Sequence, residues 1–121
     1  MTTSGTLFLI PATLSPGTAQ QTLPAYNLEL LQQLELFFVE NRKTARRFLK
    51  ECGVQPPYDH LTFSIFDKDT DMTEELNQLW PLVTGQDAGM LSEAGLPGLA
   101  DPGAALVAAC HRQGVTVKPL V

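Results

Sequence analysis

Short continuous apolar runs alternate along the chain with longer segments whose apolar positions recur at helical spacing. Runs at 6–10 and 36–39 are typical of parallel strands covered on both faces. The run at 61–66 alternates and is expected nearer a sheet edge, and shorter runs at 88–91 and 115–117 complete five strands. This order predicts an α/β fold: an open, mainly parallel five-stranded sheet with helices on both faces.

Four segments between these strands are predicted to be helices. Pro24 suits the first turn of one that reaches about Gln33, and Asn41 suits the N-cap of the next. The third follows a capping-box spacing at 71–74, and the fourth is expected over 102–113. Glycines should end the last three, at Gly53, Gly85 and Gly114. The expected packing positions of these three helices are Ala45, Phe48, Leu49, Cys52; Leu76, Leu79, Trp80, Val83; and Leu106, Val107, Ala109, Cys110.

The stretch from Ser92 to Gly103 has the composition of a sculpted loop. It contains three glycines and two prolines, which fix backbone shape rather than fill a core. Asp101 suits an N-cap and Pro102 a first helical position. The free amides at the start of this helix should therefore face the same crevice as the loop. Ligands of open parallel sheets bind beyond the carboxyl ends of the strands, where three stretches fall: 11–15, 40–43 and 92–101.

Composition and charge restrict the kind of partner. The chain has 121 residues, of which 44% are hydrophobic, as expected for one compact domain. A net charge of −5 argues against electrostatic binding of nucleic acid by the whole domain. The charge is unevenly distributed, however, because five of the eight Lys and Arg residues lie from Arg42 to Lys50. This cluster has two interpretations: a solvated helix face, or a contact with RNA.

Several kinds of site are excluded. The loop matches neither the dinucleotide fingerprint nor the P-loop, and the stretch 67–71 lacks the later residues of a calcium loop. His60 and His111 lack partners at ligand spacing, so no metal site is expected. No targeting or membrane-spanning segment is evident. Cys52 and Cys110 are therefore expected to be reduced packing residues of a cytoplasmic protein.

The string SEAGLPGLADPGAALVAACHRQGVTVKPLV, with LFLIPAT and VENRKTARRFLKECG before it, resembles the tetrapyrrole methylase family of S-adenosylmethionine-dependent methyltransferases. It is most similar to the ribosomal RNA small-subunit methyltransferase I branch, with its loop [SD]-[DE]-A-G-x-P-x-x-x-D-P-G. The positions that match this loop are Ser92, Glu93, Ala94, Gly95, Pro97, Asp101, Pro102 and Gly103.

The resemblance implies that residues 1–121 are the amino-terminal α/β domain of a two-domain enzyme, inactive alone because the second domain is absent. It implies S-adenosylmethionine as cofactor, ribosomal RNA as substrate with a ribose 2′-oxygen as acceptor, and a homodimer without a membrane partner. The implied cofactor-binding residues are Pro11, Thr13, Leu14, Glu93, Ala94, Gly95, Leu96, Pro97 and Leu99. The residues expected at the substrate are Glu40, Arg42, Lys43 and Arg46.

Two loops depart from the family pattern. Residues 12–16 differ from a T-P-I-G-N-L-like sequence, and Glu40 is followed by Asn-Arg-Lys instead of Asp-Thr-Arg. These departures indicate a divergent branch. No catalytic residue is assigned, because the carboxylates of Glu40, Glu93 and Asp101 each have a structural role open to them. The alternative function is a non-enzymatic domain that binds a small molecule or a partner in the same crevice.

Overall fold

The computed structural model describes residues 4–11, 24–66, 75–92 and 101–120. Strands and helices alternate through these residues. In chain order they are β1 (Thr6–Pro11), α2 (Ala25–Gln33), β2 (Leu36–Val39), α3 (Arg42–Glu51), β3 (Thr62–Ile65), α4 (Glu75–Val83), β4 (Ala88–Ser92), α5 (Asp101–Arg112) and β5 (Thr116–Pro119).

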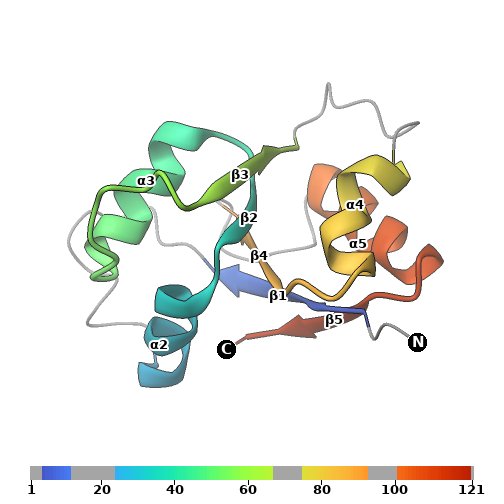
Figure 1. The fold of residues 1–121 in the computed structure, drawn as a ribbon, viewed down its shortest axis with the longest axis horizontal. Coiled ribbons are helices and arrows are strands. Elements are labelled where there is room, and N and C mark those ends of the chain that lie inside the picture. Colours follow the sequence, from blue (N-terminus) through green and yellow to red (C-terminus); the bar gives the residue numbers. More distant parts are fainter. Residues whose placement is uncertain (1–3, 12–23, 67–74, 93–100, 121) are drawn as a thin grey trace.

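The five strands form one sheet in the order β3-β2-β4-β1-β5, and all neighbouring pairs are parallel (Figure 1). The predicted α/β fold is therefore confirmed. The alternating strand β3 lies at one edge of the sheet, as its pattern predicted, and β5 lies at the other. β4 lies between β1 and β2. Both of these strands come well before β4 in the chain, so the sheet makes neighbours of strands that are distant in the sequence.

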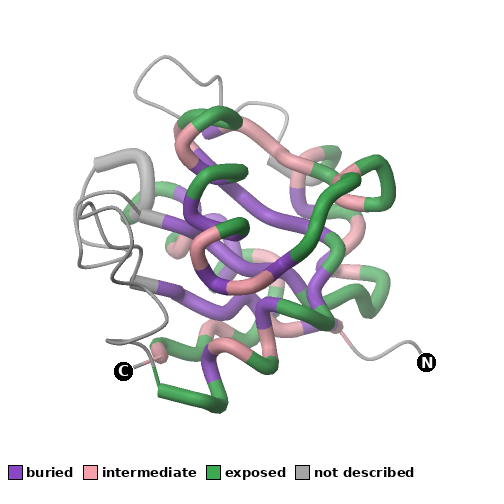
Figure 2. Tube along the Cα trace, turned by 90° about the vertical axis from the view of Figure 1, so that its left-hand side faces the viewer, coloured by how far each residue is buried: buried purple, intermediate pink, exposed green. Residues whose placement is uncertain are grey.

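Side chains alternate along the strands and divide the core into two layers. Phe8 and Ile10 of β1 pack on the side of α2 and α3, whereas Leu7 and Leu9 pack on the side of α4 and α5. The two helix pairs lie on opposite sides of the sheet in Figure 1, and Figure 2 shows buried strands between outer turns that are exposed. Burying both faces explains why β1 and β2 are almost continuously apolar.

One predicted packing residue is wrong. Trp80 of α4 was expected on the apolar face, but it is 56% exposed, and Leu82 is buried in its place. Two residues at ~100° each put Trp80 and Leu82 on opposite sides of a helix, so α4 can bury only one of them. Leu79 and Leu82 face the core together, and Val83 packs beside them.

Some element boundaries also differ from the predicted ones. α5 begins at Asp101, one residue earlier than expected, and β1 includes Pro11. β5 covers Thr116–Pro119 rather than 115–117, and an edge strand tolerates a proline that donates no hydrogen bond. The predicted helix ends are confirmed, because Gly53, Gly85 and Gly114 have φ values of 90°, 115° and 72°. The capping-box residues 71–74 lie outside the described residues.

Candidate functional site

The sheet reverses its winding between β1 and β4. The connection after β1 leads to α2 on one face, and the connection after β4 leads to α5 on the opposite face. Pro11 and Ser92, the last residues of these strands, are partners in register. Open α/β sheets bind their ligands at such a switch point, outside the carboxyl ends of the strands.

The predicted cofactor-binding residues lie, in the sequence, at or directly after the two strand ends of this switch point. Pro11 ends β1, and Thr13 and Leu14 follow it closely in the sequence. The stretch 93–99 follows Ser92 directly. Except for Pro11, these residues lie outside the described ones, and their assignment stays a prediction. The N-cap role of Asp101 is likewise untested.

Glu40 and Asn41 stand at the same edge, directly after β2. β2 is the other neighbour of β4, through the partners Phe38 and Met90. Glu40 is half-buried, and Asn41 is exposed. The Asn41 side chain accepts hydrogen bonds from the amides of Lys43 and Thr44, at 2.8 and 3.1 Å. The predicted N-cap is confirmed, and it fixes the start of α3 at the carboxyl edge.

The cations predicted to meet the substrate lie on α3. Arg42 and Lys43 form its first turn, Arg46 follows one turn later, and all three are exposed. The Arg46 Nε donates to the carbonyl oxygen of Arg42 at 3.3 Å. Glu40, Arg42 and Lys43 therefore lie close to the carboxyl end of β2, whereas Arg46 lies one turn farther along α3.

The histidine and cysteine side chains of the described segments form neither a metal site nor a reactive thiol. No three His, Cys, Asp or Glu side chains gather there as a metal site requires, and His60 and His111 are both exposed. Cys52 and Cys110 are free and buried, as predicted. Burial, with a smaller effect of the Glu51 carboxylate, raises the pKa of the Cys52 thiol from 9.0 to about 12. Cys52 is thus a packing residue and not a nucleophile.

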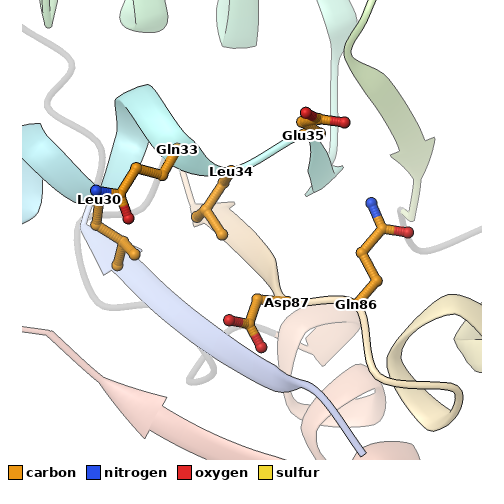
Figure 3. A pocket seen from close by; sticks show the side chains of 6 residues that line it. All are labelled: Leu30, Gln33, Leu34, Glu35, Gln86 and Asp87. Carbon is orange, nitrogen blue, oxygen red and sulfur yellow. The ribbon is translucent and has the colours of Figure 1, made fainter.

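Two polar features were missed by the sequence analysis. Gln78 of α4 donates through Nε2 to the carbonyl oxygen of Ile65, at 3.4 Å, while its buried Oε1 accepts no hydrogen bond from a described residue. A pocket of about 310 Å³ lies at the opposite, amino-terminal edge, where β2 and β4 begin. Its lining residues, seen in Figure 3, are Leu30, Gln33, Leu34, Glu35, Gln86 and Asp87. No periodic pattern marks these residues in the sequence, because they come from the end of α2 with the connection after it and from the connection before β4, which only the sheet brings together.

None of the helices in the described segments combines the length and apolar character needed to cross a bilayer.

Comparison with known proteins finds relatives over most of the chain, although no family model matches it. A ribosomal RNA small subunit methyltransferase I of Escherichia coli O157:H7 is 30% identical over 116 residues, which are 96% of this chain and 38% of that protein. The protein of the same name from Synechocystis sp. is 32% identical over 97 residues, 77% of this chain and 32% of that protein. That of Leptospira biflexa is 26% identical over 93 residues. The chain thus spans about a third of the length of the relatives it matches.

Proposed function

The chain belongs to the family of the ribosomal RNA small subunit methyltransferases I, of which it spans about a third, and on that premise we propose that it is their amino-terminal domain. In this proposal the natural protein methylates ribosomal RNA at a ribose 2′-oxygen, with S-adenosylmethionine as donor. A second domain closes the cleft, and the protein acts as a homodimer. A non-enzymatic binding domain is not favoured, since the relatives are named as methyltransferases.

The observation that carries the proposal is the pairing of Pro11 with Ser92 at the switch point of the sheet. Both stretches predicted to bind the cofactor directly follow these two residues in the sequence. A loop rich in glycine and proline offers backbone amides and carbonyls at fixed positions, which suits the adenine, amino and carboxylate groups of the donor. The residues proposed to hold it are Pro11, Thr13, Leu14, Glu93, Ala94, Gly95, Leu96, Pro97 and Leu99.

The chemistry asks little covalent help of the protein. S-adenosylmethionine, when bound, would supply a methyl group activated by its sulfonium, with a neutral thioether as the leaving group. The protein's task is to align acceptor and donor and to exclude water, which lowers the entropic part of the barrier. Glu40, Arg42, Lys43 and Arg46 would position the RNA, because β2 ends beside β4 and α3 starts there.

Isothermal titration of the natural full-length protein with S-adenosylmethionine tests this function. We expect Gly95→Ala to weaken binding by about tenfold, or ~1.4 kcal/mol, because a methyl group at this loop position crowds the cofactor. Gly114→Ala is the matched control: its Cβ meets nothing within 4 Å, so affinity should not change.

Residues 1–121 alone should bind S-adenosylmethionine weakly or not at all, because the proposed second domain supplies the rest of the cleft. Absence of binding by the full-length protein would contradict the proposed function. Equal affinity of Gly95→Ala and wild type would remove the loop from the cofactor site.

A further inference from the structure

The outer face of α3 is a continuous basic surface. Ala45, Phe48 and Leu49 are buried on its inner side, and the helix lies on the outside of the sheet in Figure 1. At ~100° per residue, the five cations of α3 fall within an arc of about 140°. All five are exposed: Arg42, Lys43, Arg46, Arg47 and Lys50. This set is called the α3 basic face below.

The α3 basic face extends well away from the switch point. Arg42 and Lys43 stand at the carboxyl edge, directly after the Asn41 N-cap, whereas Lys50 lies near the other end of the helix. Eight residues at ~1.5 Å each separate Arg42 from Lys50 by about 12 Å. Phosphates of one strand in a duplex advance by only ~3.4 Å each. The α3 basic face is therefore longer than the contact of a single reacting nucleotide.

This arrangement of charge costs the helix stability. The first turn of α3 contains no acidic residue and begins with Arg42 and Lys43, at the end where the helix dipole is positive. Like charges also recur at i and i+4, in Arg42 with Arg46 and Lys43 with Arg47, and each such pair costs a few tenths of a kcal/mol. A solvated face that merely balanced an acidic domain would intersperse both signs. The cost lies in the first turn and in these pairs, whereas Lys50 in the last turn suits the helix dipole. A cost of this kind at the start of the helix points to binding of a polyanion.

We propose that the α3 basic face binds the backbone of an extended RNA segment beyond the reacting nucleotide, with Arg47 and Lys50 on phosphates outside the site. This rests on the proposed function for the identity of the polyanion. A membrane surface fits less well, because the apolar side of α3 is buried in the core and cannot enter lipid. Arg47 and Lys50 thus set affinity for the length of RNA rather than for the nucleotide that is methylated.

The test uses the natural full-length protein with the double substitution Arg47→Gln and Lys50→Gln. Glutamine retains a long side chain and good helix propensity. The matched control is Arg112→Gln with Lys118→Gln, which removes the same charge from α5 and β5. Binding of a fluorescent ribosomal RNA fragment is followed by anisotropy over a series of KCl concentrations, and melting curves check the fold of each variant.

We expect the α3 variant to bind RNA about tenfold more weakly at low salt. Its plot of log affinity against log salt concentration should be shallower by between about 1 and 2, since two phosphate contacts are lost. The control should match the wild type. Wild-type affinity and slope in the α3 variant would overturn the inference. So would a loss of binding to vesicles of anionic phospholipid with RNA binding unchanged.

Transfer of labelled methyl groups to ribosomal RNA by the wild type separates the two proposals. If the wild type transfers methyl groups and the α3 variant binds RNA normally, the inference fails and the proposed function stands. If no methyl group is transferred but the α3 variant loses RNA affinity, the proposed function fails and the basic face still binds RNA.

Discussion

The two edges of the sheet differ in how they are connected. At the amino-terminal edge three of the four connections are short: Leu34 and Glu35 join α2 to β2, 84–87 join α4 to β4, and 113–115 join α5 to β5, whereas 52–61 join α3 to β3. At the carboxyl edge the connections after β1, β3 and β4 are each longer than these three, and only the one after β2 is short. The described residues among the predicted cofactor and substrate residues fall at this second edge or on α3, which begins there: Pro11, Glu40, Arg42, Lys43 and Arg46.

Backbone hydrogen bonds hold the amino-terminal edge together. Gly5 donates to the carbonyl oxygen of Leu82 at 2.7 Å, and Thr62 donates to that of Glu35, also at 2.7 Å. The Thr6 amide donates to the Asp87 Oδ1 at 2.8 Å. These contacts fix where β1, β3 and β4 begin, so substitutions at this edge should act on stability. Two backbone hydrogen bonds also lie at the carboxyl edge, from Phe66 to the carbonyl oxygen of Val39 and from Leu120 to that of Leu9, and α3 begins there with its exposed cations.

The largest effect is expected from Gly5→Ala at the amino-terminal edge. The new Cβ would meet the backbone carbonyl oxygen of Gln86, which cannot move without displacing the connection before β4. We expect the free energy of unfolding to fall by about 3 kcal/mol in urea denaturation.

Gly114→Ala is a suitable control for that measurement. It lies in the turn before β5, where its Cβ has open space, and only its φ of +72° is unfavourable. Its cost should be ~1 kcal/mol. Equal losses in the two variants would mean that close packing does not distinguish this edge.

A second effect, which appears only at alkaline pH, is expected at Cys52, at the end of α3 away from the carboxyl edge. In the unfolded chain the thiol has its ordinary pKa of 9.0, whereas burial raises the pKa of Cys52 to about 12 in the folded chain. Its contribution to the free energy of unfolding is complete below about pH 9 and is lost as the pH rises toward 12.

Denaturation of the wild type and of Cys52→Ala at several pH values measures this contribution. Burial also raises the pKa of Tyr58, which acts in the same direction, so the informative quantity is the difference between the two proteins. The variant should lose stability less steeply above pH ~9. Parallel curves would show that the thiol ionises without unfolding the chain.

The smallest effect is expected at Asn41, where the carboxyl edge meets α3. Asn41→Ala removes two hydrogen bonds to the first turn of the helix and should cost about 1 kcal/mol. Asn41→Asp keeps the acceptor and should retain wild-type stability or exceed it, since a carboxylate also suits the helix dipole. Melting temperatures measure both variants. A loss in Asn41→Asp as large as in Asn41→Ala would contradict the capping role.

Local patterns predicted the elements well. The apolar runs at 6–10 and 36–39 are buried strands, Asn41 caps α3, and Gly53 ends it. Such features depend on the period of side chains along the backbone and on the φ that one residue can adopt, so neighbouring residues suffice to predict them. Trp80 shows the limit of prediction from local patterns. Either Trp80 or Leu82 could have faced the core, and only the packing of α4 against the sheet determines that Leu82 is buried.

The sequence by itself determined the fold class, the Asn41 cap of α3, the glycines that end three helices and the two strand ends, Pro11 and Ser92, at which the candidate site begins. Only the tertiary structure decided that β4 lies between β1 and β2, and so that Pro11 meets Ser92. The same strand order joined two distant connections into the pocket at the amino-terminal edge. The physical reason is that an apolar run specifies burial but not a neighbour: strand order follows from pairing between distant segments and from the fit of whole helices on each face.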